Sequence, residues 1–240
     1  SKPFMLMYQF KAPHRPWDPD PKFKNLYSDS DLPYPESFND DYSGRKAASE
    51  NMLEIENHMN RKDLKLKPPA GLSKKELGRW NRYGNAGEFW SPNESLKGEE
   101  LKKWKYQRYI KDYLRCVAGV DDAVGKMLKY LKDNHLEENT VVIYTSDQGF
   151  YLGEHGWFDK RWMYEPSFRM PFMIKYPEKI KSESVNDNLI VNIDFAPTLL
   201  DIAGINIPDD MQGESFKNQL YADDYKKRDA IYYHYYEYPF

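Results

Sequence analysis

The chain has 240 residues, of which 40% are hydrophobic, 16% aromatic and 30% charged, and its formal net charge is −3. This length suits one α/β domain with a sizeable core, or part of a larger domain. The near balance of 35 basic and 38 acidic residues gives no global signal for nucleic-acid binding. The single cysteine, Cys116, excludes an internal disulfide and a cysteine-based zinc site. No apolar run reaches the roughly 18 residues that a membrane span needs.

The first element is an apolar run. Residues 4–10 read Phe-Met-Leu-Met-Tyr-Gln-Phe, which predicts a strand covered on both faces. The run stops at a loop that contains Pro13 and Pro16, since proline cannot donate to a strand ladder. An apolar beginning of this kind, and the aromatic run 231–236 at the other end, favour a piece of a longer chain.

Residues 18–104 are rich in Pro, Asp, Asn and Lys. We therefore expect a long, loop-rich insertion with short helices at most. Within it, residues 29–42 and 67–87 are predicted to be long excursions on the surface. Loops of this length are unusual in a compact domain unless they shape a site.

Regular structure is predicted again from about Trp104 onwards. Apolar residues recur at helical spacing from Tyr109 to Leu131 and predict a helix that ends near His135. The later elements are a strand, a short helix, a strand and a helix that stops at Gly204, at residues 140–145, 161–167, 172–175 and 193–203. This order predicts an α/β fold with a mainly parallel sheet flanked by helices.

Polar residues follow the strand 140–145, and ligands of open α/β sheets bind at the carboxyl ends of strands. Asp147 and Gln148 offer two hard oxygen ligands, which suit Ca²⁺ or Mg²⁺ better than zinc. Lys160, beyond the loop 153–156, could place a positive charge near an oxyanion. Taken alone, so short a motif is more often an ordinary βα turn with a capping Asp and a surface lysine.

A longer string is more specific. Residues 141–160, VVIYTSDQGFYLGEHGWFDK, closely resemble the second signature region of type I sulfatases, which belong to the alkaline-phosphatase-like superfamily. Within that family the string looks most like the branch that includes N-acetylglucosamine-6-sulfatases. The resemblance covers nearly the whole chain outside 18–104, with further matching segments in the family's usual order at residues 3–17, 113–131, 169–172, 192–204 and 211–213.

The resemblance implies roles for five residues. Asp147 and Gln148 would ligate Ca²⁺ (Mg²⁺ fits less well), with Gln148 the weaker ligand because its amide is neutral. His14 and Lys160 would contact the sulfate oxygens and stabilise the transition state electrostatically. Either could protonate the leaving group. His155 has two open readings: it donates a hydrogen bond within the site, or it is a structural histidine that fixes the loop 153–156.

Two family elements are absent from the sequence. Sulfatases of this type use a formylglycine made within Cys/Ser-x-Pro-x-Arg, and no such string occurs here. Cys116 lies on the apolar face of the predicted helix and reads as a buried structural thiol. The Asp-Asp pair that completes the family's calcium site is also missing. In the family both elements precede the segment matched here.

The resemblance therefore implies an incomplete catalytic domain. Residues 1–228 would be the C-terminal part of the catalytic α/β domain, and residues 229–240 the start of a truncated C-terminal subdomain. Its natural partner would be the missing N-terminal part of the domain. Alone, the chain is expected to bind calcium poorly and to be inactive.

The implied function is hydrolysis of sulfated carbohydrate, with 6-O-sulfated N-acetylglucosamine of a glycosaminoglycan as the first candidate substrate. The implied location is periplasmic, secreted or lysosomal. Two alternatives stay open: a phosphodiesterase or phosphonate monoester hydrolase of the same superfamily, and a non-catalytic carbohydrate-binding relative. His234 could line a sugar pocket, although an aromatic ladder on an edge strand is the favoured interpretation.

Overall fold

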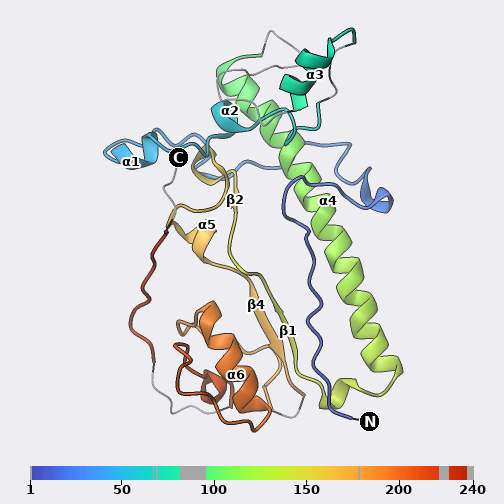
Figure 1. Cartoon of the computed structure of the whole chain (residues 1–240), viewed down its shortest axis with the longest axis vertical. Coiled ribbons are helices and arrows are strands. Elements are labelled where there is room, and N and C mark those ends of the chain that lie inside the picture. The colour runs from blue at the N-terminus through green and yellow to red at the C-terminus, as the bar shows by residue number, and fades with distance from the viewer. Residues whose placement is uncertain are drawn as a thin grey trace. The chain divides into compact units, whose positions relative to one another are not determined.

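The structure is a computed structural model that describes residues 2–66, 68, 70–81, 96–177, 179–221 and 227–236 (Figure 1). The chain divides into two compact units. The first comprises residues 1–128 and 150–162, and the second residues 129–149 and 163–238. No helix in the described parts combines the length and the apolar character of a membrane span.

One long helix, α4 (Gly98–Asp133), forms the scaffold of the first unit. It begins at Gly98, with Glu99 and Glu100 in its first turn, where carboxylates interact favourably with the helix dipole. The remaining elements of this unit are short: η1 (Pro21–Phe23), α1 (Lys46–Ser49), α2 (Ile55–His58), α3 (Lys74–Asn81), β2 (Tyr151–Leu152), η3 (Glu154–Gly156) and β3 (Phe158–Asp159). The predicted helix is confirmed, and it starts earlier than its apolar pattern indicates.

The core of the first unit forms between α4 and the segment expected to be surface loops. The buried cluster contains Trp17, Phe38, Ile55, Met59, Leu64, Tyr106, Tyr109, Ile110, Cys116 and Phe158. The surface prediction for residues 29–42 is therefore wrong at Phe38, which is only 3% exposed. Isolated apolar residues in a polar sequence show no periodicity, yet here they belong to one buried cluster with Tyr106, Tyr109 and Ile110 of the long helix. The other predicted excursion, 67–87, lies partly outside the described residues.

The thiol of Cys116 belongs to this core, which agrees with a structural role. Burial raises the pKa of Cys116 to about 11. A thiol with so high a pKa carries almost no thiolate at neutral pH and is a poor nucleophile.

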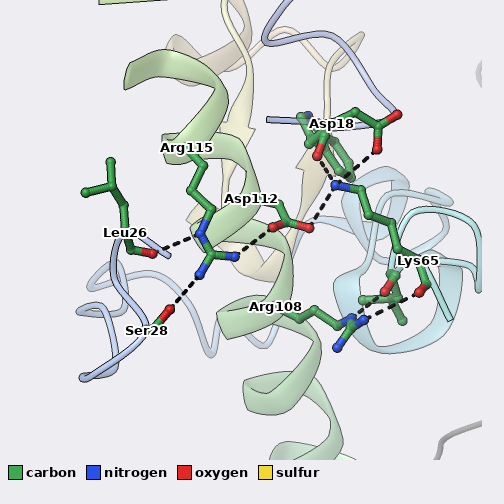
Figure 2. A network of polar contacts seen from close by, with 9 residues as sticks. Asp18, Leu26, Ser28, Lys65, Arg108, Asp112 and Arg115 are labelled. Carbon is green, nitrogen blue, oxygen red and sulfur yellow. Dashed lines mark hydrogen bonds and ion pairs between the residues drawn. The ribbon is translucent and has the colours of Figure 1, made fainter. Parts of the chain in front are cut away.

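A polar network on α4 fixes the same loop segment (Figure 2). Asp112 accepts hydrogen bonds from Lys65 Nζ at 3.0 Å and from Arg115 at 2.9 Å. Lys65 also pairs with Asp18 at 3.3 Å, and Arg115 donates to the carbonyl of Leu26 at 2.8 Å. Two parts of the loop-rich segment are thus bound to one face of the helix by charge-assisted hydrogen bonds.

The second unit is built around one strand pair. Strand β1 (Val142–Thr145) pairs with β4 (Phe172–Lys175), and Val142 lies opposite Lys175. The surrounding elements are η2 (Glu137–Asn139), α5 (Glu165–Phe168), η4 (Asn192–Asp194), α6 (Phe195–Ile202) and α7 (Lys217–Tyr221). Gly204 ends α6 as predicted, because its φ of +71° suits glycine and its N–H donates to Asp201 O at 3.1 Å.

The predicted mainly parallel sheet is not confirmed for the described residues. Both strand pairs there, β1–β4 and β2–β3, are antiparallel, so the expected mainly parallel sheet is not observed. The connection from β1 to β4 contains only short elements and the four-residue α5, and the chain reverses direction without a crossover helix. The described residues form a mixed α/β fragment.

The apolar run 4–10 forms no strand and appears as a plain trace in Figure 1. Its side chains are exposed, with Met5 at 70% and Phe4 at 59%. A strand requires a neighbouring backbone to complete its ladder of hydrogen bonds. None of the described residues supplies one.

Candidate functional site

The loop after residues 4–10 carries His14. Its side chain is exposed, its backbone N–H donates to Lys11 O at 2.9 Å, and its Nδ1 lies 2.8 Å from Arg15 O. A carbonyl only accepts, so Nδ1 must carry the proton. This contact orients the ring and occupies Nδ1, so that Nε2 is the nitrogen with which His14 could contact a ligand. A turn histidine would make the same contact, and the role of His14 in sulfate binding stays a prediction.

Lys160 directly follows β3, and the backbone on either side of it has positive φ. The residues on either side of it, Asp159 and Arg161, have φ of +74° and +100°. Positive φ costs a residue with a Cβ about 1–3 kcal/mol and persists only where surrounding contacts impose it. In the part of the chain that the structure describes, the ammonium of Lys160 forms no ion pair. The contacts of its neighbours thus hold the backbone of Lys160, and its role in sulfate binding stays a prediction.

A buried ion pair joins the two loops. Asp159, 5% exposed, lies 3.3 Å from the Arg15 guanidinium and 2.7 Å from that of Arg161. Arg15 directly follows His14, and Asp159 directly precedes Lys160. The structure therefore brings the loops of His14 and Lys160 together within one unit.

Arg15 also reaches a second buried carboxylate. Asp63 lies 3.8 Å from its guanidinium and is 3% exposed. Burial raises the pKa of Asp63, and the charge of Arg15 offsets only part of that rise. The sequence analysis missed Arg15, Asp63 and Asp159. The sequence places Asp159 and Arg161 on either side of the motif residue Lys160, but nothing local indicates that Asp159 is buried or paired with Arg15.

His155 holds its loop against residues 37–42. Its Nδ1 lies 2.6 Å from Asp40 Oδ2, its N–H donates to Ser37 Oγ at 3.1 Å, and Tyr42 Oη donates to its carbonyl at 2.6 Å. Its own φ is +58°. These contacts are those expected of a structural histidine, the second of its two readings. A contact with substrate stays a prediction.

Asp40 is the anchor of this loop, and its removal should weaken the fold. Burial raises the pKa of Asp40, but hydrogen bonds from Arg45, the Tyr42 N–H and His155 outweigh burial and hold it at about 2. Because this folded-state value lies below the usual 3.9 or so, the stabilisation is complete above about pH 4 and is lost as pH falls through 2. We expect Asp40→Asn to lower the free energy of unfolding at pH 7 by about 1–2 kcal/mol.

Urea unfolding of the parent and two variants between pH 7 and pH 2 checks this prediction. The exposed neighbour Asp41, which accepts only from Ser43 N–H in the described structure, provides the control Asp41→Asn. Asp40→Asn should flatten the acid-dependent loss and Asp41→Asn should not. Equal acid dependence in all three proteins would contradict the role of Asp40.

Asp147 and Gln148 lie on the loop after β1 in the second unit. Asp147 is exposed and forms no ion pair with any described residue; Ser146 Oγ lies 3.3 Å from its carboxylate. The loop is pinned at Gly149, whose N–H donates to Ser167 O at 2.9 Å. A Cβ at Gly149 would lie 2.1 Å from Pro166 O, so only glycine fits there.

The donor set of this loop fits a calcium ion as part of its coordination sphere. A carboxylate and an amide carbonyl are hard oxygen ligands, and Ca²⁺ takes six to eight of them. Within the described ranges no group of three or more His, Cys, Asp or Glu side chains is placed to hold a metal. Asp147 and Gln148 would therefore supply two ligands of a larger set.

The predicted site residues fall into both units. His14, His155 and Lys160 belong to the first, and Asp147 and Gln148 to the second. Convergence of the two groups on one sulfate stays a prediction.

The exposed aromatic run contains His234. Its ring centroid lies 6.3 Å from that of Tyr232 and 4.2 Å from that of Tyr236. The rings at every second residue lie near one another, but residues 231–236 are in no strand, so the predicted aromatic ladder on an edge strand is not confirmed.

Comparison with known proteins decides the family. Residues 153–240 match the family described as N-sulphoglucosamine sulphohydrolase, C-terminal. An N-acetylglucosamine-6-O-sulfatase of Bacteroides thetaiotaomicron is 43% identical over 261 aligned residues, covering 100% of this chain. The chain belongs to the sulfatase family. It spans 46% of the length of that sulfatase and matches its C-terminal part.

Solved sulfatase-like structures agree with this assignment. A protein in complex with its substrate, D-glucosamine-2-N,6-O-disulfate, superposes with a TM-score of 0.82 at 42% identity. That match covers 95% of this chain and 50% of the other. A phosphonate monoester hydrolase from Silicibacter pomeroyi superposes with a TM-score of 0.50 at 25% identity, over 69% of this chain and 34% of the other. The chain is thus a mixed α/β fragment of the sulfatase fold.

Proposed function

We propose that the full-length protein hydrolyses sulfate esters of carbohydrate, with the 6-O-sulfate of glycosaminoglycan N-acetylglucosamine as its substrate. The observation that carries the proposal is 43% identity along this whole chain to an N-acetylglucosamine-6-O-sulfatase. The structure related at a TM-score of 0.82 binds a 6-O-sulfated glucosamine, which supports the same substrate class. A periplasmic, secreted or lysosomal location belongs to this proposal, because such compartments degrade glycosaminoglycans.

In the proposed site, positive groups surround the sulfate. A calcium ion held by Asp147 and Gln148 would draw charge from the non-bridging oxygens of the ester. Negative charge develops on the leaving oxygen as the S–O bond breaks. Lys160 would stabilise this charge with its ammonium group, which pairs with no described carboxylate. His14 presents Nε2 because Arg15 O occupies Nδ1. His14 or Lys160 would deliver the proton to the departing sugar oxygen.

The nucleophile has no candidate in the sequence. No Cys/Ser-x-Pro-x-Arg string occurs, and the thiol of Cys116 is buried with a raised pKa. We propose that a formylglycine outside these 240 residues supplies it, together with the remaining calcium ligands.

A second candidate function is phosphonate monoester or phosphodiester hydrolysis. The likeness to a phosphonate monoester hydrolase favours this function. That hydrolase is 25% identical and covers 69% of the chain, whereas the structure with the sulfated sugar is 42% identical and covers 95%, so the sulfatase function is favoured more strongly. The metal and cationic groups suit either anion.

A substrate panel separates these functions. We expect the full-length protein to release sulfate from N-acetylglucosamine-6-sulfate with a kcat/KM at least about 10²-fold above that for phenyl phosphonate esters, since differential transition-state binding of a few kcal/mol gives such a ratio. Glucosamine sulfated only at the 3-position is the positional control. Faster turnover of the phosphonate would favour the second candidate. Tight sugar binding without release of sulfate would favour the non-catalytic reading.

A further inference from the structure

Four charged residues form a buried ion cluster beside the proposed anion site: Arg15, Asp63, Asp159 and Arg161. Both carboxylates are nearly inaccessible, and the side chains of Arg15 and Arg161 are 26% and 25% exposed. Such a cluster adds little to the free energy of unfolding, because the cost of desolvating the charges offsets most of their attraction. What the cluster does contribute is geometry, since it fixes the relative positions of the segments that it joins.

The ion cluster joins three separate segments of the first unit. Arg15 comes from the loop 11–17, Asp63 from a tight turn, and Asp159 from β3. Asp63 is itself fixed, because it accepts from Asn60 N–H at 3.2 Å while its own N–H donates to Asn60 Oδ1 at 3.0 Å. The guanidinium of Arg15 also lies 5.8 Å from the centroid of the Phe158 ring. Arg15 is thus held by two carboxylates and a ring.

The two proposed sulfate ligands flank this cluster in the sequence. His14 precedes Arg15, and its ring nitrogen contacts the Arg15 carbonyl. Lys160 lies between Asp159 and Arg161, which form an ion pair with each other and both have positive φ. The strain on both sides of Lys160 therefore coincides with the contacts that can impose it.

We propose that the ion cluster is a positioning unit that sets the separation of the His14 imidazole and the Lys160 ammonium for one tetrahedral oxyanion. Arg15 and Asp159 are positioning residues, since they act through His14 and Lys160. This inference rests on the proposed function, which supplies the identity of the substrate. Its test does not depend on that function, because it measures binding of inorganic sulfate as well as turnover.

The test is a double-mutant cycle in the full-length protein. Lys160→Met should raise the Kd for inorganic sulfate about 10-fold or more, and Asp159→Asn, which keeps volume and removes charge, should raise it by a similar factor. If Asp159 acts through Lys160, adding Asp159→Asn to Lys160→Met changes the Kd by less than about 2-fold. With a turned-over substrate, the same pattern should appear in kcat.

The matched control is Asp194→Asn in the second unit. Asp194 is 1% exposed and accepts from Arg228 at 2.5 and 3.0 Å, so it is an equally buried carboxylate paired with arginine. We expect this variant to lose stability without a change in sulfate Kd, measured by titration calorimetry well below its unfolding temperature.

Three outcomes overturn the proposal: multiplicative effects of Asp159→Asn and Lys160→Met, an unchanged Kd in Asp159→Asn, or no sulfate binding by the parent. Coupled sulfate binding without turnover of any sulfate ester would support the positioning unit and reject the proposed function.

Discussion

We expect the Asp147→Ala variant of the full-length protein to lose Ca²⁺ binding and at least about 10³-fold of its turnover, because a bound metal supplies several kcal/mol of transition-state stabilisation. Asp147 is exposed and forms no ion pair within the described structure. Its removal therefore costs the fold little, and the loss should be confined to the metal. Gln148→Ala should cost less, since water can replace a neutral carbonyl ligand.

Calcium titration of the chelator-treated protein, followed by kcat, measures both effects. Asp187→Ala removes another exposed carboxylate of the second unit and should change neither quantity. Equal calcium affinity in the parent and in Asp147→Ala would refute the ligand assignment, whatever the activity.

The second large effect is expected at Lys160. Lys160→Met keeps most of the side-chain volume and removes the charge, and loss of one preorganised oxyanion partner costs about 10²–10³-fold in kcat. The lysine has no described ion pair to lose, and its backbone is held by Asp159 and Arg161. The thermal unfolding temperature should therefore stay close to that of the parent.

A control lysine makes this result specific. Lys111 is also partly buried in the first unit but pairs with Asp31 at 3.1 Å, so Lys111→Met should affect stability rather than kcat. Unchanged activity in Lys160→Met would mean that Lys160 is an ordinary surface lysine.

Local sequence signals predicted the elements that local interactions determine. Strand β1 follows from β-branched residues, strand β4 from apolar residues, and the end of α6 from Gly204, which has positive φ. The helix α4 follows from apolar spacing. Long-range pairing was not predictable in this way. The direction of β4 relative to β1 depends on the connection between them, and residues 4–10 lack the neighbour that a strand needs.

The core and the ion cluster escaped prediction for the same reason. Trp17 and Phe38 are isolated apolar residues in polar surroundings, and only the fold brings them to α4. Arg15 and Asp159 are far apart in the sequence, and nothing local distinguishes them from solvated charges. The family motif indicated His14 and Lys160. The contacts that join their loops became visible only in three dimensions.

The most direct test of the account is a crystal structure of the full-length protein with Ca²⁺ and a 6-O-sulfated glucosamine. We predict His14 Nε2 and Lys160 Nζ within hydrogen-bonding distance, about 2.7–3.2 Å, of one sulfate group. Asp147 and Gln148 should coordinate a calcium ion that contacts the same sulfate. A sulfate bound elsewhere, or a His14 ring that points away from the sulfate held by the calcium ion, would contradict the proposed site.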